Sequence, residues 1–416
     1  MKEATTLIDG HYDPTQARHA VKMPIYMSSN YVFNSAEEAR DLFQHKSEPT
    51  PSGDGATPTP SGFLYSRLGH PNLLFAENRL AAYEGAETAL FFESGMAAIS
   101  TMLMGLLSPG DTVLHSTPLY GGTDHLLRGM MQRWGVRLLE YWPEEPLEKL
   151  MERTGAGQGS HRIRLIYLET PANPSLETVD FARVMALKTK ISEWRGAVPL
   201  TACDNTLLGP VFQKPLRHGI DIGIYSASKF LGGHSDLIAG ALVCSHALAG
   251  VLRGVRSQLG GTASPHTAWL ITRSMETLEL RMEAAQRNSI RLVQFLSEHP
   301  LVEKLNYPGL LPPDHTHHRQ TTGSGSLISF ELKGGQAPAF CFLNALRLIR
   351  HAVSLGGTES MACHSATTTH SNVPAAVRHQ YGIHDGLIRL SVGIEHVDDL
   401  LDDLHQALHR AGSLLA

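Results

Sequence analysis

The sequence lacks any apolar run near the roughly 18 residues of a membrane span, and Met1–Thr6 opens without a long apolar stretch. It also lacks a basic surplus, because 40 Asp and Glu outnumber 35 Lys and Arg. That balance disfavours nucleic acid and anionic membranes as partners. The four cysteines have neither disulfide nor metal-ligand spacing and indicate reduced thiols in a cytoplasmic protein. His315, His317 and His318 follow Pro312-Pro313-Asp314, so we interpret them as a polar loop rather than as metal ligands.

At 416 residues, the chain is long for one hydrophobic core and short for three, which predicts two folded domains. Residues 1–64 show little periodicity, and Lys46–Pro60 within them is rich in Pro, Gly, Ser and Thr, as loops are. We therefore predict an N-terminal arm with a flexible loop over 1–64, an α/β domain over 65–264 and an α+β domain over 265–416.

Apolar runs alternate with segments of helical spacing between about residues 70 and 245, which predicts an α/β domain with a mainly parallel sheet. The predicted strands include 89–92, 112–115, 136–141, 163–168 and 239–243, and the predicted helices include 97–107, 122–134 and 181–194. The C-terminal part predicts helical structure over 265–298, strands over 325–332, 352–355 and 387–392, and a closing helix over 397–411.

Two of the predicted strands end in residues that suit pyridoxal phosphate. Lys229 closes the segment Ser226-Ala227-Ser228-Lys229, and Asp204 ends an apolar run about 25 residues upstream. A lysine amine can bond to the aldehyde of this cofactor, and a carboxylate can keep its ring nitrogen protonated. Taken alone, Lys229 is also compatible with a solvated surface residue. Because ligands gather at the carboxyl ends of parallel strands, Ser94-Gly95-Met96 and Glu169 are expected at the same edge of the sheet.

An ordered set of motifs decides between these interpretations. The motifs are Tyr65-Ser66-Arg67, Ser94-Gly95-Met96, Leu119-Tyr120-Gly121-Gly122-Thr123, Glu169-Thr170-Pro171-Ala172-Asn173-Pro174, Asp204-Asn205-Thr206, Ser226-Ala227-Ser228-Lys229, Ser354-Leu355-Gly356-Gly357 and Arg389-Leu390-Ser391-Val392-Gly393. With them the chain resembles the Cys/Met-metabolism family of pyridoxal-phosphate enzymes, from about Pro24 to its C-terminus. That family includes cystathionine γ-synthase, cystathionine γ- and β-lyases, methionine γ-lyase and O-acylhomoserine sulfhydrylases.

The resemblance implies the fold and the cofactor. The fold is type I of the pyridoxal-phosphate enzymes, similar to aspartate aminotransferase, with a mainly parallel sheet in the large domain and a smaller α+β C-terminal domain. The cofactor is pyridoxal 5'-phosphate. The residues expected to bind it are Asp204 at the ring nitrogen, Lys229 at the aldehyde, Tyr120 against the ring face, and Gly95, Met96, Ser226 and Ser228 at the phosphate. Lys229 is also expected to act as the general base, and Tyr120 as an acid or base at the leaving group.

The resemblance also implies how the substrate and a second subunit are bound. Arg389 is expected to hold the substrate α-carboxylate as a planar two-point donor, with Asn173 and Ser354 beside it. Tyr65 and Arg67 match residues that reach the phosphate of the neighbouring subunit. A homodimer is therefore expected at minimum, and a homotetramer built as a dimer of dimers.

The choice of reaction depends on Val353 and Leu64. Both stand where cystathionine-handling relatives typically carry Glu, which would suit the distal ammonium of cystathionine. An unpaired ammonium in an apolar pocket costs several kcal/mol, so Val353 is expected to border a substrate with an uncharged tail. This favours γ-elimination on a methionine-like amino acid, which gives a 2-oxo acid, ammonia and the leaving group.

Other reactions stay open. Methionine γ-lyases usually carry Cys at Gly122 and Lys near Arg256, whereas Gly122 matches the synthase and sulfhydrylase pattern, so γ-replacement on an O-acylhomoserine is an alternative. The long segment before Tyr65 also leaves room for an unusual substrate such as canavanine, and cystathionine chemistry is a further possibility. A catalytically silent relative that acts as a binding or regulatory protein is disfavoured, because Lys229, Asp204 and Arg389 are all present and no DNA-binding helix-turn-helix is seen.

Overall fold

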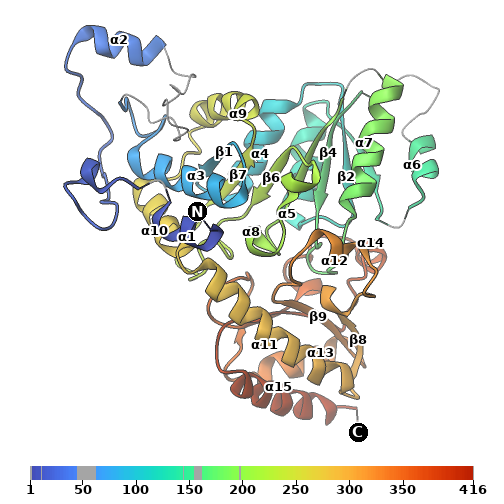
Figure 1. Ribbon diagram of the computed structural model, residues 1–416. Helices are drawn as coiled ribbons and strands as arrows, with labels where there is room; N and C mark the ends of the chain where they lie inside the picture. Colours follow the sequence, from blue (N-terminus) through green and yellow to red (C-terminus); the bar gives the residue numbers. More distant parts are fainter. Residues whose placement is uncertain are drawn as a thin grey trace.

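The computed structural model describes residues 2–10, 12–44, 62–143, 145–153, 162–195 and 198–415, and within these ranges it forms two sheets (Figure 1). The predicted loop at 46–60 lies outside the described residues. In the order of hydrogen-bonded neighbours, the larger sheet comprises β1 (Thr88–Phe92), β7 (Gly240–Cys244), β6 (Ile222–Tyr225), β5 (Leu200–Asp204), β4 (Arg162–Glu169), β2 (Asp111–Ser116) and β3 (Arg137–Tyr141).

The larger sheet is mainly parallel, as predicted. Strands β6, β5, β4, β2 and β3 pair in parallel with one another in that order, and β7 runs antiparallel to both β1 and β6. A parallel sheet of this kind is buried on both faces, which explains why its strands are continuous apolar runs rather than alternating ones. Strands β1 and β5, for example, contain no exposed residue.

Helices cover both faces of the larger sheet. Alternate strand residues point to opposite faces, so Leu90 and Phe92 of β1 pack with α4 (Gly95–Leu106) and α9 (His246–Leu259). On the other face, Phe91 packs with α3 (Pro71–Glu84) and α10 (Pro265–Met275), while α7 (Phe181–Arg195) covers β4 and β5. These layers hold the carboxyl ends of β4, β5 and β6 at one edge.

The smaller sheet lies at the far end of α11 (Leu278–Glu298), the long helix that leads to it in Figure 1. Its order is β10 (Arg350–His351), β11 (Met361–His364), β12 (Leu387–Ser391), β9 (Leu327–Leu332) and β8 (Val302–Asn306). A separate core joins this sheet to α13 (Gln336–Ala345) and α15 (Val397–Gly412). The α+β prediction for this part is therefore confirmed, while the boundaries predicted at 65 and 265 remain predictions.

The remaining helices are short. They are α1 (Glu3–Asp9) and α2 (Ala36–Gln44) in the arm, α5 (Gly121–Leu126) after β2, α6 (Leu147–Arg153), α8 (Gly209–Phe212), α12 (Thr316–Gln320) and α14 (Ala375–Gln380). Among the described residues, no helix is both long enough and apolar enough to cross a membrane.

Three predicted elements differ from the structure. The helix predicted over 122–134 divides into α5 and a π-helical turn over Leu127–Met131, and the helical stretch over 265–298 divides into α10 and α11. The strand predicted over 352–355 is wrong, because Ser354 has a φ of 87°, which no strand residue adopts. At that point the chain leaves the small sheet, and Ser354 instead contacts Lys229.

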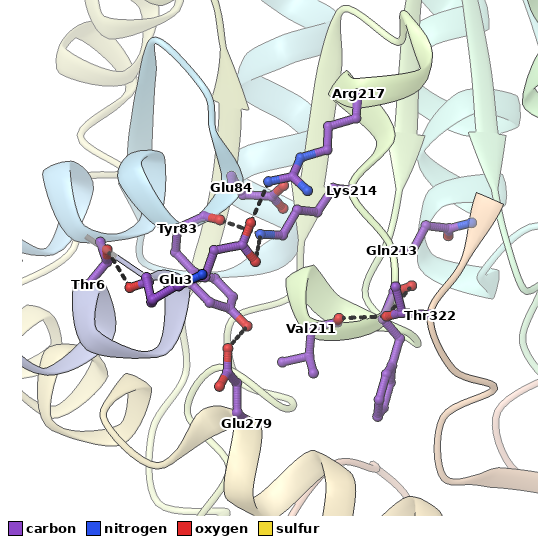
Figure 2. Close-up of polar contacts among 12 residues, drawn as sticks. Glu3, Thr6, Tyr83, Glu84, Val211, Gln213, Lys214, Arg217, Glu279 and Thr322 are labelled. Carbon is purple, nitrogen blue, oxygen red and sulfur yellow. Dashed lines mark hydrogen bonds and ion pairs between the residues drawn. The ribbon is translucent and has the colours of Figure 1, made fainter.

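A buried acid, Glu84, is hydrogen-bonded to the ends of the central strands of the larger sheet. Glu84, at the end of α3, accepts a hydrogen bond from the Tyr225 hydroxyl. The Tyr225 hydroxyl oxygen in turn accepts one from Asn205 Nδ2 at 3.0 Å. Asn205 directly follows Asp204. On the outer side, Lys214 Nζ donates to Tyr83 O at 2.6 Å and to Glu3 Oε2 at 2.8 Å, which ties α1 to the same region (Figure 2).

The Glu84 carboxyl predicts a dependence of stability on pH. Burial raises its pKa from 4.5 to about 8, although the Lys214 and Arg217 charges oppose this. The folded chain therefore holds more protons than the unfolded chain between these two pKa values, and stability falls as pH rises across that window. Glu84→Gln cannot ionise, so its Tm should fall less between pH 5 and 8 than that of the wild type. Thermal unfolding measures this, with Glu298→Gln at the exposed end of α11 as control; equal pH slopes would contradict it.

Candidate active site

Three neighbouring strand ends meet at one edge of the larger sheet. Glu169 ends β4 and pairs in register with Asp204, which ends β5, and Ser226 follows the end of β6. Because these strands are parallel, their carboxyl ends lie side by side. The predicted gathering of Glu169, Asp204 and Lys229 at this edge is thus the arrangement in the structure.

Asp204 is a buried carboxylate with a single hydrogen-bonding neighbour in its own turn. Its Oδ1 accepts from Thr206 N at 3.1 Å and from Thr206 Oγ1 at 2.6 Å. Burial raises the pKa of Asp204, and the two bonds from Thr206 oppose that rise. Thr206 Oγ1 also accepts from Ser226 N at 2.8 Å, which links the ends of β5 and β6. The site therefore offers a carboxyl group whose charge a neighbouring cation would stabilise.

The Lys229 amine lies against the segment that leaves the small sheet. Its Nζ donates to Ser354 Oγ at 2.8 Å. Burial, and then the nearby Arg389 charge, lower the pKa of Lys229. A lysine in these surroundings releases its proton more readily than a solvated one, as a base or a nucleophile requires.

Arg389, on β12, is a buried cation with neutral partners. It is 3% exposed, its Nη1 donates to Asn173 Oδ1 at 3.1 Å, and its Nη2 donates to Ser354 O at 2.6 Å. Within the described ranges it forms no salt bridge, and its buried Nε has no hydrogen-bond partner. Burying an uncompensated charge is costly, so this guanidinium suits a carboxylate supplied by a ligand.

The N-terminus of α4 lies against Ser226. A Cβ placed on Gly95 would be 3.1 Å from the Ser226 Cα, so a side chain here would crowd Ser226. Ser94 Oγ caps the helix by accepting from Ala97 N at 3.0 Å. The N–H groups of the first helical turn have no partners within the helix, which suits an anion at Gly95 and Met96. Ser228 differs, because its hydroxyl pairs with the backbone of Ala239.

Tyr120 precedes α5, and its side chain is 41% exposed. Its ring lies over Gly122, since a Cβ there would be 2.6 Å from Tyr120 Cε1 and 3.1 Å from Met96 Sδ. Tyr120 and the first turn of α4 are therefore neighbours, although the chain separates them by more than a strand. Its backbone N–H donates to Glu169 Oε2 at 2.5 Å.

Among the described residues, Tyr65 and Arg67 make no hydrogen bond to the Lys229 cluster, whereas Val353 directly precedes Ser354, which does. Arg67 Nη1 donates to Ser257 O on α9 and its guanidinium carbon is 5.7 Å from the Tyr65 ring centre, while Tyr65 is 42% exposed. Val353 is also 54% exposed, so this chain alone does not enclose an apolar pocket at that side chain.

Sequence reasoning assigned no role to Glu169 or Thr206. Both residues stand in motifs that it singled out, and their position at strand ends was the available signal. In the part of the chain that the structure describes, no cluster of three His, Cys, Asp or Glu side chains suits a metal ion.

Comparison with known proteins gives one consistent result. The model of the Cys/Met metabolism PLP-dependent enzyme family matches residues 4–409. L-Methionine gamma-lyase of Pseudomonas putida is 40% identical over 97% of this chain and 96% of its own length. L-Methionine gamma-lyase of Fusobacterium nucleatum subsp. nucleatum is 39% identical over 93% of each chain. The solved cystathionine gamma synthase of Xanthomonas oryzae pv. oryzae with aminoacrylate and cysteine superposes with a TM-score of 0.86, at 33% identity over 99% of each chain.

The contact between Gly122 and Tyr120 predicts the effect of a single methyl group. In Gly122→Ala the added Cβ would overlap the Tyr120 ring, which has to turn away. Overpacking of this kind costs about 1–3 kcal/mol, and if it falls on a reacting group, kcat decreases about tenfold or more. Steady-state kinetics measure this. Gly250→Ala is the matched control, because no atom lies within 4 Å of its added Cβ; identical kinetics of the two variants would contradict the prediction.

Proposed function

The chain belongs to the Cys/Met metabolism family of pyridoxal-phosphate-dependent enzymes, and on that premise we propose that it is a γ-eliminating lyase of the methionine γ-lyase type. Methionine and water would give 2-oxobutanoate, ammonia and methanethiol. The observation that carries the proposal is the buried Arg389, which has neutral partners within 3.1 Å and lies beside the Lys229 amine. A buried cation next to a lysine of lowered pKa suits an amino acid, bound by its carboxylate while its α-proton is removed.

The residues at the strand edge fit pyridoxal phosphate. Asp204 would hold the ring nitrogen, the first turn of α4 with Ser226 would hold the phosphate, and Lys229 would hold the aldehyde. The close approach of Gly95 to Ser226, which a Cβ would obstruct, supports the phosphate assignment. Ser228 would contribute its hydroxyl only by sharing it with Ala239. When bound, the cofactor supplies an aldehyde carbon for amines and a cationic ring that withdraws electrons from the substrate α-carbon.

Three side chains of the protein would then bind the substrate, remove its α-proton and protonate the leaving group. Arg389 orients the substrate by its carboxylate, with Asn173 and Ser354 fixing the guanidinium plane. Lys229 Nζ, directed by its bond to Ser354 Oγ, takes the α-proton. Tyr120 would stack against the cofactor ring and donate a proton to the departing sulfur. These roles need one amine, one guanidinium and one phenol, all of which the site provides.

Two observations support a substrate with an uncharged side chain. Val353 and Leu64 offer no carboxylate to a second ammonium group, and two methionine gamma-lyases are 39–40% identical to the chain. Gly122 favours a second candidate, γ-replacement on an O-acylhomoserine, because glycine at this position matches the synthase and sulfhydrylase pattern, whereas methionine γ-lyases usually carry Cys there.

A homodimer at minimum, and a homotetramer beyond it, are part of the proposal. Within the described residues, Arg67 bonds to Ser257 of its own chain and Tyr65 is 42% exposed, which leaves both available to a neighbour's phosphate. The arm also exposes apolar side chains that a second subunit would cover: Val21 is 83%, Met27 74% and Val32 98% exposed. Cytoplasmic location stays a prediction from the cysteines.

A direct assay separates elimination from replacement. The purified enzyme with cofactor should convert methionine alone to a 2-oxo acid, ammonia and a thiol, each measured against Lys229→Ala as control. If a product forms only from O-acetylhomoserine with an added thiol, the lyase proposal fails and the second candidate takes its place.

The substrate preference can be tested at Val353. Because this side chain is 54% exposed, a charge pair there is screened by water and is worth little. Val353→Glu should therefore raise kcat/KM for cystathionine relative to methionine by only about 2- to 5-fold. Val353→Gln is the matched control, because Gln is similar in size to Glu but uncharged. An unchanged ratio in Val353→Glu would remove the argument from the missing carboxylate.

A further inference from the structure

Glu169 is a buried carboxylate whose two oxygens each accept a backbone N–H group. Oε2 accepts from Tyr120 at 2.5 Å, and Oε1 accepts from Asn173 at 2.9 Å. Its own N–H donates to Ser116 Oγ at 3.0 Å, which holds the residue against the end of β2. Glu169 is 3% exposed, so water has little access to replace these bonds.

These bonds continue into the substrate site. Asn173, held by Glu169, accepts from Arg389, which donates to the Ser354 carbonyl, and the Ser354 hydroxyl accepts from Lys229. Tyr120 and Lys229 are thus the two ends of one continuous series of hydrogen bonds. Glu169 is the only side chain in this series that contacts the Tyr120 backbone within the described residues.

The backbone at Tyr120 is held from two sides. Its carbonyl accepts from Asp124 N at 3.0 Å as the N-cap of α5, which Gly121 and Gly122 begin. The Tyr120 side chain makes no hydrogen bond within the described residues and is 41% exposed. The place of the phenol therefore depends on its backbone, and the Glu169 carboxyl is the buried side chain that anchors the N–H side of that backbone.

We propose that Glu169 is a positioning residue, which sets the Tyr120 phenol relative to the Arg389 guanidinium and so determines where a departing γ-substituent meets Tyr120. The inference rests on the proposed function for its kinetic consequence but not for its structural one. Glu169 would matter for departure of the γ-group and for binding of the α-carboxylate. Removal of the α-proton by Lys229 depends on Ser354 and would be little affected.

A glutamine at position 169 tests whether both carboxyl oxygens have to accept. Burial, and then the Asp204 charge, raise the pKa of Glu169, while the two N–H donors stabilise its ionised form. A glutamine has the same shape but only one accepting oxygen, so Glu169→Gln leaves either Tyr120 or Asn173 with an N–H group facing an NH2 group. The variant therefore removes one of the two anchors without opening a cavity.

Amide hydrogen exchange tests the anchoring without any substrate. In Glu169→Gln, at least one of the backbone amides of Tyr120 and Asn173 should exchange about tenfold faster or more, as expected when a buried N–H group loses its acceptor. Glu145→Gln, which alters another buried glutamate outside the series, is the control. Unchanged exchange at both amides would overturn the proposal.

Two kinetic measurements test the positioning role. At a saturating concentration of norleucine, an amino acid without a leaving group, the rate of α-proton exchange in D2O reports on Lys229 and should change less than twofold. Formation of 2-oxo acid from the γ-substituted substrate should fall about tenfold or more, and Glu169→Ala should lower it further. An equal loss of both activities would reveal a collapsed site and overturn the proposal, as would unaltered 2-oxo acid formation. If methionine proves not to be a substrate while the amide result holds, the proposed function fails and the anchoring by Glu169 does not.

Discussion

The site depends on the buried Arg389 guanidinium, which has no carboxylate partner among the residues that the structure describes. Arg389 comes from the small sheet, and it bonds to Asn173 of the large α/β unit and to the Ser354 carbonyl of the segment that leaves the small sheet. Both partners are neutral, so the positive charge is oriented but not neutralised. Lys229, next to it, is pushed toward its uncharged form. One unpaired charge thus joins the two units, keeps the lysine ready to accept a proton, and reserves a place for an anion.

The acidic residues at the strand edge are buried as well, and their pKa values are raised. Asp204 and Glu169 lie in register at adjacent strand ends, and burial raises the pKa of each, as it does for Glu84 beneath them. A site with an exposed edge would lose these shifts to solvent. The helices on both faces of the parallel sheet keep water from these acids. A ligand with one cationic and one anionic end would therefore pair its cation with the acids and its anion with Arg389.

Much of the fold follows from local pattern, and the exceptions have physical causes. Continuous apolar runs predicted the parallel sheet because strands buried on both faces need them. The strand predicted at 352–355 failed because its apolar residues border the site: Ser354 adopts a φ of 87°, which places its hydroxyl on Lys229 and its carbonyl on Arg389. Strand β8 was missed because several of its residues are exposed and polar, so its apolar pattern is weak. Local rules fail most where tertiary contacts over-determine the backbone.

For the site, residue types, their order and the family resemblance predicted the cofactor, which the family match supports. The roles of Lys229, Asp204 and Arg389 stay predictions, each made because one step of the chemistry requires that kind of side chain. Which of these side chains contact each other, and how deeply each is buried, could be read only from the folded chain. Lys229 and Ser354 are 125 residues apart, and Asn173 and Arg389 are 216 apart, yet each pair is in hydrogen-bond contact. The joining of Tyr120 to Asn173 through Glu169 is likewise invisible in a linear motif, since it depends on which strands become neighbours. Local sequence patterns specify elements and chemistry, whereas contacts between distant segments depend on the path of the whole backbone.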